Sequence, residues 1–171
     1  VIGFTGSTEI GCKIAEICGR LNKRVSLEMG GKNAQIVMDD ANLELALEGA
    51  LWGAFGTTGQ RCTATSRLIV HKDVYETFLN MLKQRTEKLK IGDGLVAGTD
   101  MGPVIHMKSL VNCERIVKVA LSEGGRLISG GKRCTASDLQ KGCFFEPTII
   151  ADVDQTHTIF NEEVFGPVLC V

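Results

Sequence analysis

The fold is decided by residues 33–71, which read NAQIVMDDANLELALEGALWGAFGTTGQRCTATSRLIVH. An apolar strand pattern over 33–38 is followed by Asp and Asn residues that can cap a helix, and then by apolar side chains at helical spacing as far as about Phe55. A second buried strand is predicted over 67–71. A strand, a helix and a strand of these lengths predict parallel pairing with a right-handed crossover.

The alternation of strands and helices continues on both sides of this stretch. Upstream, a strand over 1–6 leads into a helix whose apolar residues recur from Ile10 to Leu21, and a strand follows over 24–29. Downstream, the patterns predict helices from Asp73 and over about 108–123, a loop over 92–103, and strands over 126–131, 143–150 and 164–171. The sequence therefore predicts an α/β fold, a Rossmann-like open, mostly parallel twisted sheet with flanking helices.

The chain has one candidate domain boundary, the pair Gly30-Gly31. We expect residues 1–30 to belong to one domain and residues 31–171 to a second. The first and last residues both fall inside strand patterns, so we expect the sequence to be a fragment of a longer protein.

The charge of the chain argues against two classes of partner. Nineteen basic and twenty acidic residues are mixed along the sequence, which gives no basic patch for nucleic acid or an anionic membrane surface. No apolar run approaches the roughly 20 residues that a membrane helix needs. We therefore expect neither nucleic acid nor a membrane among the partners.

The cysteines do not follow a disulfide or metal-binding pattern. There are seven, an odd number, with no C-x-x-C pair and none near a histidine at metal-ligand spacing. We therefore predict no metal site and a reducing compartment. Six of the seven are expected to be small packed residues: Cys12, Cys18, Cys113, Cys134, Cys143 and Cys170.

The turn between the first strand and the first helix is a candidate phosphate site. Its sequence, GFTGSTEIGCK at 3–13, brings backbone N–H groups and the helix dipole together. It matches neither the G-x-G-x-x-G pattern, because Thr5 replaces the second glycine, nor the P-loop, because Cys12 stands where lysine is required. From these residues alone, a tight turn capped by Ser7 remains an open interpretation.

Glu28 and Cys62 are the candidates for catalysis. Glu28 ends an apolar strand just before two glycines, where a partly desolvated carboxylate can act as a base, although a solvated strand-end carboxylate fits the same pattern. Cys62 lies in the polar, glycine-punctuated stretch 56–67, where Arg61 and backbone donors can favour the thiolate. The alternative for Cys62 is a small packed residue.

Two further features have less specific patterns. The segment NEEVFGPV at 161–168 combines two acids, an aromatic residue, a glycine and a proline, which a turn or a cap also explains. His71, His106 and His157 are isolated from any serine or cysteine motif, and we predict structural or surface roles for them.

Four segments taken together resemble the aldehyde dehydrogenase superfamily. They are FTGSTEIG, LEMGGKNA, GQRC and EEVFGP, which occur in that order, with Glu28 and Cys62 34 positions apart. The resemblance covers the chain from end to end, and four co-linear motifs are far more specific than one. It implies that residues 1–30 are the C-terminal end of a coenzyme-binding domain and that residues 31–171 are a catalytic domain truncated at its C-terminus.

The resemblance also implies roles for single residues. Cys62 matches the nucleophile and Glu28 the general base. The residues that match cofactor contacts are Gly6, Ser7 and Gly11 in the pyrophosphate turn, and Glu163 and Phe165 at the nicotinamide ribose. The implied cofactor is NAD or NADP, with NAD favoured.

The implied reaction oxidises an aldehyde to a carboxylic acid. Cys62 attacks the aldehyde carbon to give a thiohemiacetal, hydride transfer to the nicotinamide leaves a thioester, and Glu28 activates the water that hydrolyses it. The resemblance further implies a small-molecule aldehyde as substrate, a cytoplasmic location, and a parent protein that is a homo-dimer or homo-tetramer.

Arg61 is the most informative departure from the family pattern, because most members have a smaller or apolar residue before the nucleophile. The GQRC form resembles branches that oxidise carboxylate-bearing semialdehydes. The guanidinium could bind the substrate carboxylate in bidentate fashion. A structural salt bridge or a surface charge is the alternative for Arg61.

The family's oxyanion-hole asparagine and its adenosine-ribose contacts lie upstream of the matched segments, so we predict little or no dehydrogenase activity for the fragment alone. Two other functions remain open. A cysteine hydrolase or acyltransferase would need His106 or His157 as the base for Cys62, and a non-catalytic interaction module would keep the fold without the reaction.

Overall fold

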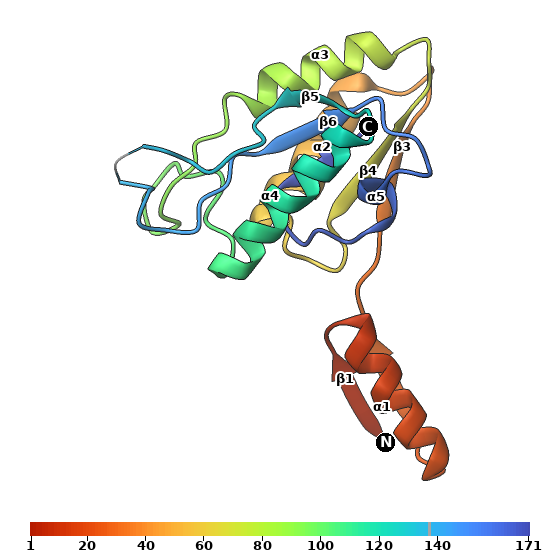
Figure 1. The fold of residues 1–171 in the computed structure, drawn as a ribbon. Helices are drawn as coiled ribbons and strands as arrows, with labels where there is room; N and C mark the ends of the chain where they lie inside the picture. The colour runs from red at the N-terminus through yellow and green to blue at the C-terminus, as the bar shows by residue number, and fades with distance from the viewer. Residues whose placement is uncertain (137) are drawn as a thin grey trace. The chain divides into compact units, whose positions relative to one another are not determined.

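The structure, a computed structural model, describes residues 1–136 and 138–171 (Figure 1). Contacts divide the chain into two compact units, Val1–Gly31 and Lys32–Val171. Within the described residues, none of the helices combines the length and the apolar character that crossing a membrane requires.

The first unit is a single strand, helix and strand. Strand β1 (Ile2–Thr5) leads into helix α1 (Thr8–Arg20), and β2 (Val25–Glu28) returns parallel to β1. The helix begins where predicted because Ser7 caps it, its Oγ accepting a hydrogen bond from the Ile10 N–H at 3.4 Å. The carboxyl ends of both strands therefore lie beside the start of the helix.

The apolar face predicted for α1 is only partly covered within this unit. Gly11 and Cys18 are buried, whereas Ile10 and Ile17 are 44% and 48% exposed, because two strands cover only a narrow stripe of the helix. Cys12 is exposed, so the prediction that it is a packed residue is wrong for this unit.

The second unit contains the strand, helix and strand predicted from residues 33–71. They are β3 (Asn33–Val37), α2 (Leu43–Phe55) and β4 (Thr65–Val70), and β3 pairs with β4 in parallel. The other elements are the 3₁₀ turn η1 (Gly56–Gly59), α3 (Tyr75–Thr86), α4 (Met107–Ser122), β5 (Arg126–Ser129), β6 (Thr148–Ala151), α5 (Thr158–Asn161) and β7 (Val168–Cys170).

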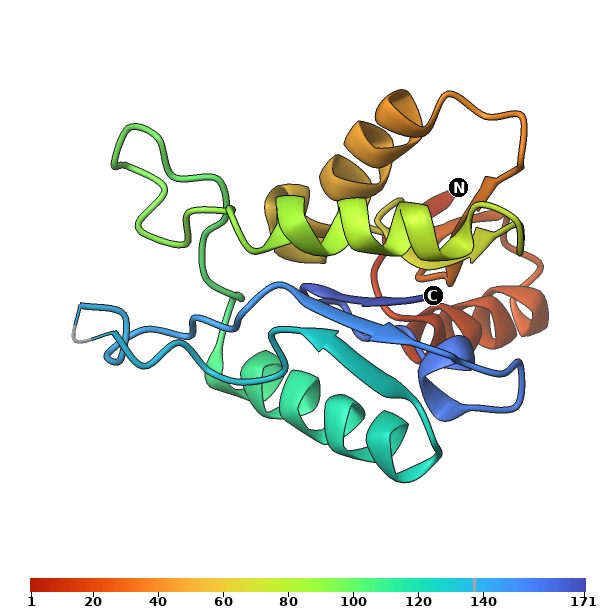
Figure 2. The same cartoon turned by 90° about the horizontal axis from the view of Figure 1, so that it is seen from above.

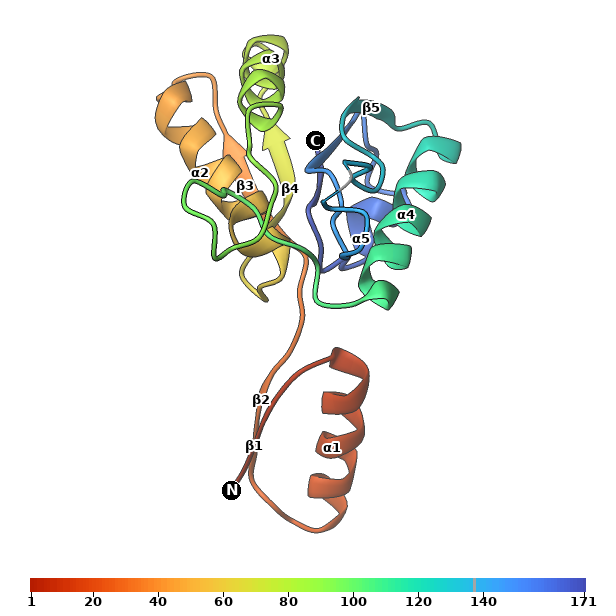
Figure 3. The same ribbon diagram turned by 90° about the vertical axis from the view of Figure 1, so that its left-hand side faces the viewer.

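The five strands of the second unit form one sheet in the order β3-β4-β7-β6-β5, in which only the β5–β6 pair is antiparallel. Helices α2 and α3 cover one face of the sheet, and α4 and α5 cover the other (Figures 2 and 3). The predicted α/β fold with a mostly parallel sheet is confirmed.

Two apolar cores lie on the two faces of the sheet. Side chains alternate between the faces along a strand, so in β6 Ile149 packs with the α2–α3 core and Ile150 with the α4–α5 core. Both side chains are fully buried. The two cores hold the strands in position, and the candidate site residues of this unit lie in the segments directly before β4 and β7.

The predicted boundaries of the last two strands are wrong, and the strand expected over 164–171 is restricted to β7 (Val168–Cys170). The strand expected over 143–150 is restricted to Thr148–Ala151, because Pro147 has no N–H to donate to a ladder, and Phe145 forms only an isolated bridge with Arg133. The four-residue helix α5 was not predicted, since a single turn is too short to show helical periodicity.

Helix α4 has an unusual cap that gives a testable prediction. His106 precedes the helix in extended conformation, and its Nδ1 accepts a hydrogen bond from the Ser109 N–H at 3.0 Å. We expect His106→Ala to lower the stability of the full-length protein by about 1 kcal/mol, because the Ser109 N–H keeps the His106 carbonyl but loses the side-chain acceptor that caps the helix. The midpoint of urea unfolding measures this change. His106→Asn is the matched control, and the cap assignment fails if Asn and Ala destabilise equally.

Candidate active site

Cys62 follows a left-handed turn that ends helix α2. Thr57 and Thr58 have φ of 58° and 60°, and Gly59 has φ of 66°. Positive φ is rare for a β-branched residue. Each such residue costs on the order of 1–3 kcal/mol, and the conformation persists only where the surrounding structure enforces it. Strained backbone of this kind clusters at functional sites. The turn leaves Cys62 exposed just before β4 begins.

Gly59 is held against the loop that precedes β7. A Cβ on Gly59 would lie 2.3 Å from the carbonyl oxygen of Gly166, so no other residue fits at this contact. Gly166 is itself backed by α4, because a Cβ on Gly166 would lie 2.4 Å from Cys113 Sγ. The turn before Cys62 and the segment that carries Glu163 and Phe165 are therefore in direct backbone contact.

Asn33 orients the backbone around Cys62. Its Nδ2 donates hydrogen bonds to the carbonyl oxygen of Cys62 at 2.6 Å and to that of Ala64 at 3.1 Å. Among the residues that the structure describes, the backbone N–H of Cys62 donates to no acceptor. A free N–H next to the thiol is the kind of donor that stabilises a developing oxyanion.

The buried cysteines are unsuited to the role of nucleophile. Burial raises the pKa of Cys113 to about 12 and that of Cys134 to about 11, so both remain thiols at neutral pH. All seven cysteines are free thiols.

Arg61 lies on the face of a tryptophan. Its guanidinium carbon is 5.1 Å from the centroid of the Trp52 ring, and its Nη2 donates to the Trp52 carbonyl oxygen at 3.1 Å. Among the described residues Arg61 forms no ion pair, so these contacts do not support the salt-bridge alternative. The Trp52 side chain is 64% exposed, and a cation on this ring lies next in sequence to Cys62.

The loop before β7 carries Glu163 and Phe165. Phe165 has φ of 54° and is 43% exposed, so an aromatic ring is presented in a strained backbone conformation. The Lys32 Nζ is buried without a hydrogen-bond partner among the described residues. Burial lowers the pKa of Lys32 from its usual 10.5, an effect that the negative charge of Glu163 partly opposes.

In the first unit, Glu28 and the glycine turn lie at the same edge. Glu28 is the last residue of β2, its side chain is exposed, and its carbonyl oxygen accepts a hydrogen bond from the Gly6 N–H at 3.0 Å. Gly11 brings α1 close to the strands, because a Cβ there would lie 2.4 Å from Met29 Sδ. The unit thus brings together Gly6, Ser7 and Glu28.

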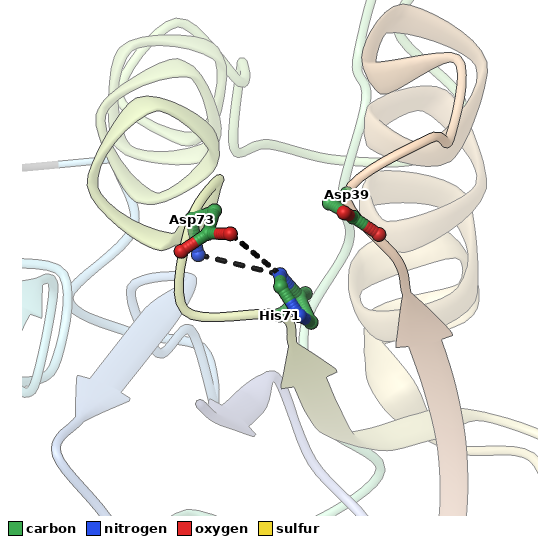
Figure 4. Close-up of side chains that lie close together, drawn as sticks. All are labelled: Asp39, His71 and Asp73. Carbon is green, nitrogen blue, oxygen red and sulfur yellow. Dashed lines mark hydrogen bonds and ion pairs between the residues drawn. The ribbon is translucent and has the colours of Figure 1, made fainter.

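The three histidines are engaged locally. His106 caps α4, and His157 Nδ1 accepts a hydrogen bond from the Asp154 N–H at 3.3 Å. His71 lies with Asp39 and Asp73 at the carboxyl ends of β3 and β4, where their ligand atoms lie within 4.8 Å of one another (Figure 4). The His71 Nδ1 accepts a hydrogen bond from the Asp73 N–H at 3.4 Å and lies 3.8 Å from Asp73 Oδ2, and both aspartates are exposed, so local contacts account for the position of His71. In the part of the chain that the structure describes, no histidine bonds to Cys62.

A comparison of the whole chain with protein families decides the assignment. The profile of the Aldehyde dehydrogenase family matches residues 1–171. The chain belongs to the aldehyde dehydrogenase family. The four motifs that predicted this from the sequence lie on β1 to α1, on the end of β2, on the turn before β4, and on the loop before β7.

Individual aldehyde dehydrogenases agree with this assignment. Aminoaldehyde dehydrogenase 2, peroxisomal, of Malus domestica is 46% identical over 170 residues, which are 99% of this chain and 33% of that protein. Succinate semialdehyde dehydrogenase of Acinetobacter baylyi is 42% identical over 168 residues, which are 98% and 34% of the two chains. The chain therefore spans about a third of the length of the curated relatives it matches.

Solved aldehyde dehydrogenase structures have the same fold. The crystal structure of betaine aldehyde dehydrogenase from Staphylococcus aureus in complex with NAD⁺ superposes with a TM-score of 0.96 at 42% identity. The superposition covers 99% of this chain and 34% of that one.

Several residues of the site have no signal in the sequence. Asn33 belongs to a quoted motif, but its bonds to Cys62 and Ala64 join positions about 30 residues apart. Trp52 reads only as one apolar residue of α2, and Lys32 as one more surface lysine. A short polar residue two positions after a double glycine was the one available hint for Asn33.

Proposed function

We propose that the protein containing this chain is an NAD(P)-dependent aldehyde dehydrogenase that oxidises an aldehyde to a carboxylic acid, with Cys62 as nucleophile. One observation carries the proposal. The exposed Cys62 thiol follows a strained left-handed turn and lies next to its own backbone N–H, which donates to no acceptor among the described residues. The other chain segments place candidate cofactor residues at a helix N-terminus and on the loop that touches this turn.

Cys62 would attack the aldehyde carbon through its thiolate and give a thiohemiacetal, whose oxyanion the Cys62 N–H can stabilise. A bound NAD(P)⁺ would supply the acceptor for the hydride that leaves this carbon. Glu28 would then take a proton from a water molecule as the water oxygen attacks the thioester carbon. The C–S bond breaks, which releases the carboxylic acid and the Cys62 thiol. The domain assignment stays part of this proposal, with residues 1–30 in the coenzyme-binding domain and 31–171 in the catalytic domain.

The residues present fit a dinucleotide. The first N–H groups of α1 have no partner within the helix, so they are donors that a pyrophosphate can accept from. Phe165 offers an exposed ring and Glu163 a carboxylate at the contact with the Cys62 turn. We propose that Gly6, Ser7 and Gly11 form the pyrophosphate turn and that Glu163 and Phe165 bind the nicotinamide ribose. NAD is favoured over NADP.

The test is a spectrophotometric assay of the full-length protein. With NAD⁺ and a series of short aldehydes, we expect reduction of the cofactor with formation of the matching acid. Alkylation of Cys62 should abolish the reaction. Absence of cofactor reduction with either NAD⁺ or NADP⁺ across aldehydes of different charge would overturn the proposal. A cytoplasmic location and a homo-dimer or homo-tetramer stay predictions, since plant relatives are peroxisomal or chloroplastic by name.

We also propose that the substrate is a semialdehyde with a carboxylate, which Arg61 binds. Trp52 holds the guanidinium by stacking and through its carbonyl, and this leaves further N–H groups of Arg61 for a ligand. A relative of this chain is named succinate semialdehyde dehydrogenase, and another glutarate-semialdehyde dehydrogenase.

Arg61→Ala in the full-length protein is expected to lower kcat/KM for a semialdehyde acid by about 10- to 100-fold, because a hydrogen bond to a charged group contributes roughly 1.5–3 kcal/mol. For an uncharged aldehyde of equal length, we expect a change of less than about threefold. Arg61→Lys, which keeps the charge without the planar fork, should give an intermediate value. Equal losses for both substrates would show that Arg61 does not select the carboxylate.

A further inference from the structure

The turn that precedes Cys62 is fastened to a distant segment by the side chain of Gln60. The Gln60 Oε1 accepts a hydrogen bond from the Ile105 N–H at 2.8 Å, and its Nε2 donates to the Pro103 carbonyl oxygen at 3.4 Å. Both ends of one amide are thus used, on backbone groups two residues apart and more than 40 positions away in the sequence. The orientation of the amide is fixed by these partners, since only the nitrogen can donate.

Thr58 makes a second connection to the same segment. Its Oγ1 donates to the Gly102 carbonyl oxygen at 3.1 Å, and the residue is only 3% exposed. Residues 102–105 therefore contact the turn at three backbone groups. We call residues 102–105 the strap.

The strap is itself anchored by its own backbone and by the residue that follows it. The Val104 N–H donates to the Cys143 carbonyl oxygen at 3.0 Å, and His106, directly after the strap, caps α4. The Thr57 and Thr58 backbone is in a conformation that relaxes unless it is over-determined. The strap supplies that constraint from outside the turn, whereas the turn's own short-range bond, from the Thr57 hydroxyl to the Gly56 carbonyl, does not reach across to another element.

We propose that Gln60, with Thr58, is a positioning residue for the nucleophile, and that the strap sets where Cys62 Sγ and the Cys62 N–H lie. This rests on the proposed function of Cys62. The geometry is direct, since Gln60 is two residues from Cys62 and no flexible side chain lies between the amide and the backbone it holds. A displacement of about 1 Å at a reacting atom can lower the rate on the order of 100-fold. Gln60 does not touch substrate or cofactor in this role.

The test uses two isosteric changes in the full-length protein. Gln60→Glu keeps the acceptor for Ile105 but replaces the donor with a charged oxygen that faces the Pro103 carbonyl. Thr58→Val removes only the hydroxyl that reaches Gly102. Gln140→Ala is the matched control, because Gln140 also donates from Nε2 to a backbone carbonyl, that of Thr135, in an exposed segment.

Two measurements separate positioning from general stability. The first is kcat and KM for an aldehyde, where we expect kcat to fall about 10- to 100-fold in Gln60→Glu and KM to change less than about threefold. The second is the rate of alkylation of Cys62 by iodoacetamide relative to that of the exposed Cys12, followed by mass spectrometry of the peptides. We expect this ratio to fall at least about fivefold in both variants and to stay unchanged in Gln140→Ala.

The alkylation ratio also keeps the proposal distinct from the proposed dehydrogenase activity. It can be measured without cofactor or aldehyde, so an inactive wild type would count against the dehydrogenase and leave this test intact. Unchanged ratios in Gln60→Glu and Thr58→Val would overturn the positioning role, whatever happens to the melting temperature. A parallel change of the Cys62 and Cys12 alkylation rates would also overturn it, because an effect on the whole protein does not select Cys62.

Discussion

Replacing Cys62 by serine in the full-length protein is expected to lower kcat for aldehyde oxidation by about 1,000-fold or more, without a large change in cofactor binding. A serine hydroxyl is almost fully protonated at neutral pH, and the turn offers Cys62 no histidine that could take its proton among the described residues. A thiol needs no such base, since a few per cent is already thiolate at neutral pH. The measurement is steady-state cofactor reduction together with titration of bound NADH by fluorescence.

Cys143→Ser is the matched control for this prediction. Cys143 is a free, partly exposed cysteine that lies 81 positions after Cys62 in the sequence. It packs against the α4–α5 core but is not one of its fully buried residues. We expect its kcat to stay within about twofold of the wild type. If Cys62→Ser keeps more than a tenth of the wild-type kcat, Cys62 is not the nucleophile.

The parts of the fold that the sequence predicted are those fixed by local pattern. The strand, helix and strand over 33–71 are present because each apolar period is long enough to be recognised and the helix has its own cap, Asn42, whose Oδ1 accepts from the Leu45 N–H at 3.1 Å. The antiparallel pairing of β5 with β6 was not predictable in this way. It depends on where the chain returns after α4, and residues 130–147 separate β5 from β6, far more than the two residues of a tight hairpin.

The site shows the same division between local and distant causes. Motifs pointed to Cys62, Glu28, Glu163 and the glycine turn, because those residue types stand out from their neighbours. The left-handed conformation of Thr57 and Thr58 could not be predicted, since threonine disfavours it and the groups that enforce it lie more than 40 positions away. The contact of Gly59 with Gly166 is equally invisible in the sequence, because either glycine alone reads as a turn residue. Backbone strain enforced at long range marks a functional site more clearly in the structure than in the sequence.

Glu28→Gln in the full-length protein is expected to separate the two halves of the reaction. The amide has the shape of the carboxylate but cannot take a proton from water, so steady-state kcat should fall by about 100- to 10,000-fold. Attack by Cys62 and loss of hydride come earlier and do not need the same base, so we expect the first turnover to persist as a burst of NADH close to one per active site. Stopped-flow absorbance with excess aldehyde measures both quantities. Hydroxylamine should restore part of the turnover, because a stronger nucleophile than water cleaves a thioester without a base.

The matched control for Glu28 is Glu16→Gln on α1, whose carboxylate is exposed and pairs with Arg20 at 3.7 Å. A surface pair of this kind contributes at most about 1 kcal/mol to stability, so we expect burst and steady state to stay within about twofold of the wild type. Three results would decide against Glu28 as the base for deacylation. They are an unchanged kcat, a burst lost together with kcat, and a slow steady state that hydroxylamine does not accelerate. The second would place Glu28 in the activation of the Cys62 thiol instead, because the first chemical step would then need the carboxylate as well.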